Sequence, residues 1–109
     1  MTDSIVIFVT AGSAAEAETI AKALVEEQLA ACVNILSLIR SIYHWEGKLA
    51  DDQEWLLLIK TRAERFSAVE ARVKALHSYQ TPEVIALPIV QGSEDYLRWL
   101  SDNVSKPRG

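Results

Sequence analysis

The sequence is short of the residues that cross-link, kink or strongly charge a chain. Cysteine occurs once in 109 residues, at Cys32, which excludes an internal disulfide framework and indicates a reducing compartment. The 4 glycines and 3 prolines are scattered, and no linker, repeat or low-complexity segment is present. Basic residues number 11 against 15 acidic ones and are dispersed among them, so no nucleic-acid-binding face is expected.

Long hydrophobic runs are also missing. The apolar run near the N-terminus spans only about five residues with no basic segment before it, so neither a signal peptide nor a membrane span is expected. Half of the residues are hydrophobic and 24% are charged, which is typical of globular proteins. We therefore expect one cytoplasmic domain over residues 1–109, with a loose tail at about 104–109.

The pattern of apolar residues predicts four strands and three helices. The continuous run "SIVIFVT" is typical of a buried central strand, and Ser13 with Glu16 has the capping-box spacing that begins a helix. Pro88 places the last strand at a sheet edge or a bulge. The expected elements are a helix at 14–28, a long strand at 30–45 bent near Arg40 and Ser41, a turn at 46–53 that includes Asp51 and Asp52, a strand at 54–61, a helix that ends near His77, a strand at 84–90 and a last helix opened by Ser93.

The order β-α-β-β-α-β-α predicts an α+β fold, a ferredoxin-like split β-α-β sandwich. Two helices would cover one face of an antiparallel sheet, and the C-terminal helix is an addition. The other face must meet water or a partner. Because the long hairpin carries Tyr43, Trp45, Trp55 and Leu57, we expect that partner to be another subunit.

His77 lies in "HSYQTPEV", between a predicted helix and a strand. A histidine at a helix end is more often a structural hydrogen bonder than a metal ligand. Tyr79, Gln80 and Glu83 lie nearby in sequence and make a poor ligand set for a tightly held ion.

Cys32 and His44 are the other residues that could carry chemistry. Cys32 lies in an apolar strand and is expected to behave as a small hydrophobe. His44 is expected on an exposed polar face of the hairpin or at a subunit contact. No Ser-His-Asp arrangement and no glycine-rich phosphate loop can be assembled, so no enzyme is predicted.

Several segments together resemble one family. "AACVNI", "SIYHWEGK", "EWLLLIKT" and "HSYQTPEVIALPIVQGSEDYLRWL" occur in the order and spacing of the CutA divalent-cation tolerance proteins, and the similarity runs from the first strand through the last helix. This resemblance implies a ferredoxin-like fold, a cytoplasmic homotrimer with strands pairing between subunits, and a role in tolerance of divalent metals, copper above all. It implies no catalytic activity and no obligatory cofactor.

The resemblance also implies a metal site at His77, Tyr79 and Glu83. Three departures from the family pattern weaken it. Val9 and Leu76 stand where copper-binding members carry a cysteine and a second histidine, and Gln80 replaces a frequent glutamate. We therefore expect weak binding of copper or another divalent cation near His77, completed across a subunit boundary.

Two alternatives remain open at this point. The family resembles PII-type signalling proteins, so a small anion or metabolite could bind in a cleft between subunits. Tyr43 and Trp45 would line that cleft, and Lys48, Lys60 and Arg62 would supply its positive charge. The other alternative is a structural or interaction module that binds no ligand.

Overall fold

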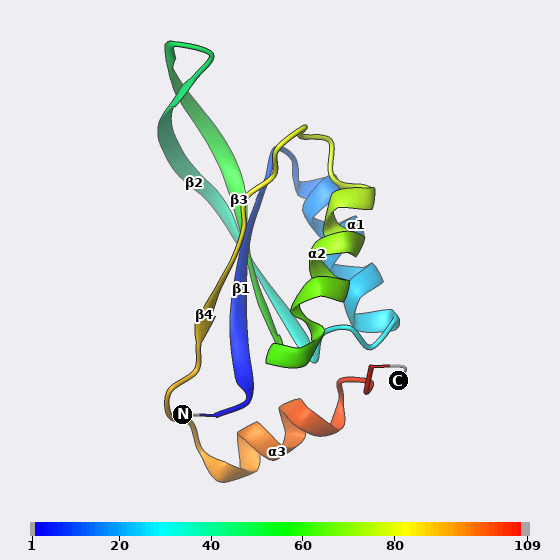
Figure 1. Cartoon of the computed structure of the whole chain (residues 1–109). Coiled ribbons are helices and arrows are strands. Elements are labelled where there is room, and N and C mark those ends of the chain that lie inside the picture. Colours follow the sequence, from blue (N-terminus) through cyan, green and yellow to red (C-terminus); the bar gives the residue numbers. More distant parts are fainter. Residues whose placement is uncertain (1, 108–109) are drawn as a thin grey trace.

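The computed structural model describes residues 2–107 as an α+β protein with one four-stranded antiparallel sheet and three α-helices (Figure 1). The strand order across the sheet is β2-β3-β1-β4. The elements in chain order are β1 (Ser4–Ala11), α1 (Ala14–Glu26), β2 (Cys32–Trp45), β3 (Lys48–Arg62), the 3₁₀ turn η1 (Ala63–Arg65), α2 (Phe66–Leu76), β4 (Val84–Pro88) and α3 (Glu94–Asp102).

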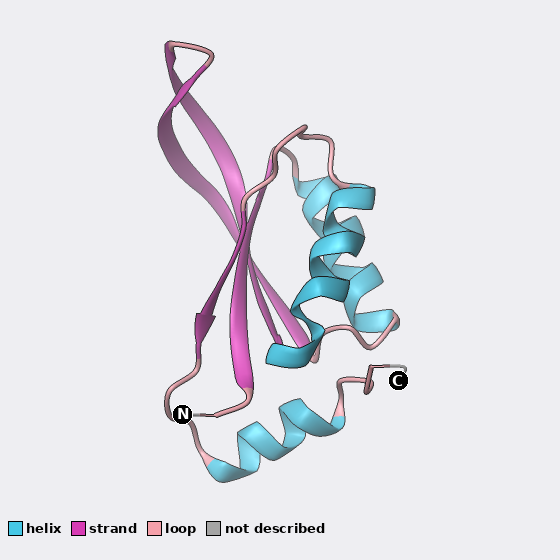
Figure 2. Cartoon of the chain, in the orientation of Figure 1, coloured by secondary structure: helices cyan, strands magenta, loops and turns pink. Residues whose placement is uncertain are grey.

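The core lies between one face of the sheet and two helices. In Figure 2, α1 and α2 cover the same face of the sheet, and α3 lies across one end of it. Alternate residues of the central strands point toward the helices, which is why Ile7 on β1 and Ile59 on β3 are fully buried. Ile20 and Leu24 of α1 and Val69 and Val73 of α2 meet them, at the helical spacing expected from the sequence.

The predicted helix start at Ser13 is confirmed, although only half of the capping box forms. The Ser13 hydroxyl accepts a hydrogen bond from the Glu16 backbone amide at 3.1 Å. The Glu16 carboxylate does not return to Ser13, because it accepts hydrogen bonds from the backbone amide and hydroxyl of Ser78 at 2.6 and 2.9 Å. Glu16 therefore ties the start of α1 to the loop that follows α2.

The hairpin is longer and its turn is shorter than the sequence suggested. Only Glu46 and Gly47 form the turn, both with positive φ, as a type I′ hairpin turn requires. Asp51 and Asp52, which we had placed in the turn, are paired residues of β3. Strand geometry is possible for them because Asp51 forms a two-point ion pair with Arg40, and Asp52 accepts a hydrogen bond from a tyrosine on β2.

The predicted bend of the long strand is present but lies earlier. The pairing of β2 with β3 shifts between Leu36 and Ile39, and Leu38 there has a φ of 57°. Such a left-handed residue marks a bulge. Leucine gives no sequence signal for that conformation, which explains the misplacement near Arg40 and Ser41.

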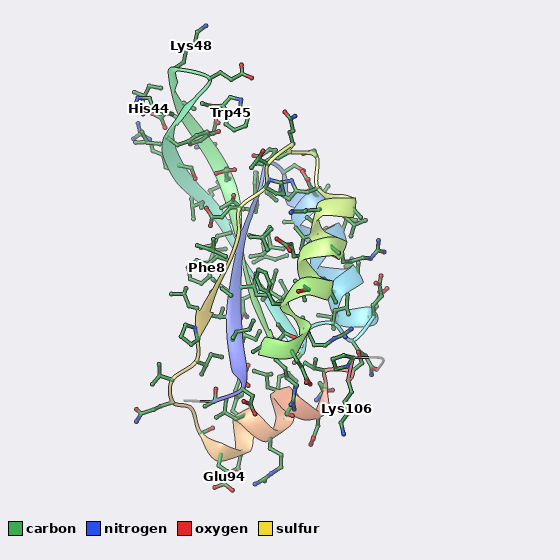
Figure 3. The ribbon with its side chains drawn as sticks, in the orientation of Figure 1. Phe8, His44, Trp45, Lys48, Glu94 and Lys106 are labelled. Atoms are coloured by element: carbon green, nitrogen blue, oxygen red, sulfur yellow. The ribbon has the colours of Figure 1, made fainter. Side chains whose placement is uncertain are left out.

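The face of the sheet that points away from α1 and α2 is apolar, and neither of these helices covers it (Figure 2). Phe8 lies on this face in Figure 3, and it is paired with Leu58 on β3 and Ile85 on β4. Leu36, Ile85 and Leu87 are 42%, 52% and 45% exposed. We call this surface, formed by Val6, Phe8, Leu36, Leu56, Leu58, Ile85 and Leu87, the open face. β4 is an edge strand, as Pro88 predicted.

The last helix forms a second small core rather than extending the first. Leu100 of α3 is fully buried with Ala31 and Val104. The expectation of a loose tail from residue 104 is therefore wrong for Val104 and Ser105, since Ser105 also hydrogen-bonds the Gln28 carbonyl through its amide. The remainder of the predicted tail includes residues 108 and 109, which lie outside the described residues.

Candidate functional site: an acidic, aromatic cavity beside His77

A cavity lies between the hairpin and the loop that joins α2 to β4. Its volume is about 390 Å³, which falls in the range of small-molecule sites. One wall comes from β2 and β3, the other from the loop, and the end of β1 closes it. The residues that line it are Thr10, Tyr43, Trp45, Asp52, Tyr79, Gln80, Thr81 and Glu83.

Tyr79 links the loop to the sheet. Its hydroxyl donates a 2.8 Å hydrogen bond to the carboxylate of Glu54, a residue of β3 that is only 4% exposed. Burial and this bond raise the pKa of the Tyr79 phenol well above its usual range. Gly12 makes the approach possible, because a Cβ at that position would lie 3.0 Å from the Tyr79 hydroxyl oxygen.

The hairpin wall contributes a second hydrogen bond from a tyrosine hydroxyl to a carboxylate. The Tyr43 hydroxyl donates a 2.6 Å hydrogen bond to Asp52 Oδ2, and that bond raises the pKa of the Tyr43 phenol. Trp45 lies two residues further along β2 and is 49% exposed. Figure 3 shows Trp45 and His44 on opposite sides of the hairpin tip, so His44 does not face the cavity.

Negative charge accumulates at this cavity. Loss of hydration, and then the nearby charge of Glu54, raise the pKa of Glu83 above its ordinary value. No lysine, arginine or histidine is among the described residues that line the cavity. The site therefore has the electrostatic character of a cation receptor.

His77 is a buried hydrogen-bonding residue under the loop. Its side chain is fully buried, and Nε2 lies 2.6 Å from the Thr10 carbonyl oxygen, to which it donates. Nδ1 accepts from the backbone amide of Tyr79 at 3.0 Å, and Glu16 Oε1 lies 3.3 Å from the same nitrogen. In these bonds Nε2 is the donor and Nδ1 the acceptor toward the backbone, and together they hold Tyr79 toward the cavity.

The predicted metal residues lie close together but do not form a first coordination shell. Tyr79 and Glu83 line the cavity, whereas both ring nitrogens of His77 are engaged beneath it. Within residues 2–107, no three histidine, cysteine, aspartate or glutamate side chains are placed so that they could hold one metal ion. The donor set of a single chain therefore does not fit a tight metal site, and the ligand role of His77 stays a prediction.

The structure separates the residues proposed for an anion cleft. Tyr43 and Trp45 line the cavity, but Lys60 lies near α3, with its ammonium 5.6 Å from the centre of the Tyr96 ring. Arg62 hydrogen-bonds Ser101 of α3, and Lys48 lies at the hairpin tip (Figure 3). One chain thus does not bring these cations to the aromatic wall.

The other predicted site residues take structural positions. Leu57 is fully buried in the core of its own chain and offers no surface to a second subunit, and Trp55 packs half-buried against the same core. Cys32 is partly exposed, 3.8 Å from the Asn34 side-chain oxygen, rather than buried.

Sequence reasoning missed Asp52 and Glu54 as site residues. Asp52 was assigned to a turn, and Glu54 was treated only as the start of an apolar strand. A signal existed for Glu54, since an acid two residues before Leu56 lies on the same apolar sheet face. Such an acid needs a partner, and Tyr79 supplies a hydrogen bond but no positive charge.

The fold and the cavity define a small α+β protein with an apolar sheet face and an acidic pocket at the end of its sheet. The chain belongs to the family described as "CutA1 divalent ion tolerance protein", whose pattern it matches over residues 5–103. The divalent-cation tolerance protein CutA of Thermus thermophilus is 54% identical over 98 residues, which cover 90% of this chain and 95% of that protein.

Solved structures of the family agree with the fold. The Thermus thermophilus structure superposes with a TM-score of 0.91 at 52% identity, covering 94% of this chain and 99% of that one. The structure described as periplasmic CutA from Archaeoglobus fulgidus gives a TM-score of 0.91 at 46% identity over 94% and 99% of the two chains. A chloroplastic CutA of Arabidopsis thaliana is 48% identical over 100 residues, 92% of this chain and 55% of that protein. Among the described residues, no helix is long and apolar enough to cross a membrane.

Proposed function

We propose that the protein acts in tolerance of divalent metals, copper among them, by binding a cation weakly beside His77 within a homotrimer. The observation that carries this proposal is the pair of acids, Asp52 and Glu83, in the described lining of a cavity that includes no basic side chain, with a third acid, Glu54, bonded to the lining residue Tyr79. The names of its relatives point the same way, since they describe tolerance of divalent cations rather than a reaction. No catalytic role is proposed.

His77 would act at this site mainly through the loop that it holds. Its Nδ1 accepts the Tyr79 amide, so a metal ion could reach that nitrogen only after the Tyr79 backbone moved. Tyr79 and Glu83 would face the ion directly, as the sequence resemblance implies. Because residues 2–107 of one chain place no third ligand there, weak binding completed by a second chain fits this donor set best.

The homotrimer is supported by the open face. An apolar sheet surface of this size is not usually left in water by a stable monomer. The hairpin extends beyond the body of the protein in Figure 1 and carries Tyr43 and Trp45 at 38% and 49% exposure. In the ferredoxin-like arrangement that we propose, copies would pack these faces together and pair their hairpin strands. A cytoplasmic location is part of the same proposal and is tested by fractionation of cells that produce the protein.

Equilibrium dialysis against equal concentrations of copper, zinc, nickel and cobalt, with bound metal counted per chain, tests the metal proposal. The variants His77→Ala and Glu83→Gln are compared with the wild type, and Glu94→Gln, an exposed charge change on α3, is the matched control. We expect severalfold lower uptake in the first two variants and wild-type uptake in Glu94→Gln. Equal uptake in all four proteins, or none in any, would contradict the proposal.

A further inference from the structure

The loop that forms one wall of the cavity is held by a residue outside the cavity. Ser78 follows His77 in this loop and donates two hydrogen bonds to the carboxylate of Glu16. Its backbone amide lies 2.6 Å from Oε1, and its hydroxyl lies 2.9 Å from Oε2. Glu16 belongs to α1 and is not among the described residues that line the cavity. A helix on the core side of the sheet therefore fixes the segment that carries Tyr79 and Glu83.

This contact is stronger than an ordinary surface hydrogen bond. It uses both oxygens of one carboxylate, and hydrogen bonds to an ionised acceptor are roughly twice as strong as bonds between neutral groups. The Glu16 side chain is only 15% exposed, so water competes little for either oxygen. Glu16 and Ser78 are 62 residues apart in the sequence. The contact therefore joins two distant elements and does not stabilise a local turn.

Glu16 gives up a local partner to make this contact. The Ser13 hydroxyl accepts a hydrogen bond from the Glu16 amide, and a glutamate at this spacing can accept the Ser13 amide in return. The Glu16 carboxylate is bonded to Ser78 instead. It thus has two possible partners, one at the start of its own helix and one in the cavity loop. The structure holds it with the loop.

The same carboxylate also lies beside the histidine that positions Tyr79. Glu16 Oε1 is 3.3 Å from His77 Nδ1, and this nitrogen accepts the Tyr79 amide at 3.0 Å. Ser78 and Tyr79 are neighbours in the chain, so a shift of Ser78 away from Glu16 would move the Tyr79 amide as well. Glu16 can therefore influence a cavity-lining residue that it does not bind.

We propose that Glu16 is the positioning residue of the cavity loop, and that its contact with Ser78 sets the affinity of the cavity for a divalent cation. This inference rests on the cation binding proposed above and names the residue that regulates it. If the contact is lost, fewer molecules hold the loop in the binding position. The apparent Kd for the cation then rises in inverse proportion to the fraction that does.

Amide hydrogen exchange of the full-length protein, without metal, tests the positioning of the loop. Glu16→Ala removes both acceptors, and Ser78→Ala removes only the hydroxyl donor. Glu18→Ala removes an equal charge from an exposed position of the same helix and is the matched control. In Glu16→Ala we expect exchange to accelerate about tenfold more at the Tyr79 amide than at the Val73 amide of α2, with a smaller effect in Ser78→Ala.

Two results of this experiment would overturn the proposal. An unchanged rate at the Tyr79 amide in Glu16→Ala would mean that the loop does not depend on Glu16. Equal acceleration at Tyr79 and Val73 would mean that Glu16 only stabilises the whole fold, since a core helix then opens together with the loop.

Equilibrium dialysis of the same proteins against Cu²⁺ tests the effect on affinity. We expect the Kd for Cu²⁺ to be about tenfold higher in Glu16→Ala, roughly two- to threefold higher in Ser78→Ala and unchanged in Glu18→Ala. Equal affinity of the wild type and Glu16→Ala would overturn this inference and leave the proposed function standing. An equal loss in Glu18→Ala would overturn it too, because the cause would then be charge and not loop position.

The two experiments separate failure of this inference from failure of the proposed function. If the wild type takes up no Cu²⁺, the proposed function is wrong, and the effect of Glu16 on affinity is wrong with it. Hydrogen exchange then still decides whether Glu16 positions the loop, because that measurement uses no metal.

Discussion

At the scale of single residues, His77 contributes both to the stability of the fold and to the position of the cavity loop. Its fully buried ring bridges the Thr10 carbonyl of β1 and the Tyr79 amide of the cavity loop. Truncation leaves both backbone groups without their partner and opens a void, so His77→Ala should lower the free energy of unfolding by about 2–3 kcal/mol. Urea unfolding measures this change.

His44 is the matched control for that measurement. It is the other histidine of the chain and lies exposed on the hairpin. His44→Ala should change the free energy of unfolding by no more than about 0.5 kcal/mol. If both variants were equally stable, the structural role assigned to His77 would be wrong.

Glu83 gives the site a pH dependence with a definite sign. Its pKa is raised in the folded protein, so the fold binds this proton more tightly than the unfolded chain does. The stability contributed by the protonated form is present below the ordinary glutamate pKa of about 4.3 and is lost as the pH rises through the higher folded value. Glu83→Gln should therefore be more stable than the wild type at pH 7, by no more than about 1 kcal/mol, and equal to it near pH 4.

The pH series is read by thermal or urea unfolding of both proteins in matched buffers. Glu94 is an exposed residue of α3. The difference in stability between Glu94→Gln and the wild type should therefore stay constant with pH. A wild type that gained stability over Glu83→Gln as the pH rose would mean that Glu83 is stabilised as the anion, contrary to the account of the cavity.

At the scale of elements, the hairpin turn offers a change that needs no knowledge of function. Glu46 and Gly47 both have positive φ, and asparagine tolerates that conformation better than glutamate does. Glu46→Asn should raise the free energy of unfolding by about 0.5 kcal/mol. Glu46→Gln removes the same charge without the conformational preference and should have a smaller effect. If Glu46→Asn and Glu46→Gln raised the free energy of unfolding equally, the cause would be the lost negative charge and not the backbone conformation.

Most elements could be predicted because local signals decided them. Ser13 and Ser93 mark helix starts by hydrogen bonds to amides three residues on, and Pro88 marks an edge strand. The β2 bulge could not be placed, because Leu38 adopts a left-handed conformation that its residue type does not signal. Aspartate is common in turns, and nothing near Asp51 in the sequence indicates that its ion pair with Arg40 across the hairpin holds it in a strand.

The site was less predictable than the fold for the same reason. "HSYQTPEV" could be singled out from sequence, and Tyr79 and Glu83 do line the cavity. The importance of Asp52 and Glu54 depends on contacts across β2, β3 and the loop, at separations of 9 residues to Tyr43 and 25 to Tyr79. No local pattern encodes such pairs.

At the scale of the whole molecule, the open face predicts that folding and assembly are coupled. If copies pack these apolar faces together, the folded state is stabilised by association, and the melting temperature should rise with protein concentration. Differential scanning calorimetry over a hundredfold range of concentration measures this, and sedimentation at the same concentrations should give the mass of a trimer. A reversible melt with a constant midpoint and a monomeric mass would contradict the proposed homotrimer.

Paramagnetic NMR with copper tests most directly whether a cation binds in the acidic cavity beside His77. Cu²⁺ is added in small steps to ¹⁵N-labelled full-length protein, and the loss of each amide signal is followed. We expect the amide signals of Tyr79, Gln80, Thr81 and Glu83 and of Asp52 and Glu54 to broaden first, while those of α3 stay sharp. Earliest broadening at exposed His44, or equal broadening throughout, would contradict it.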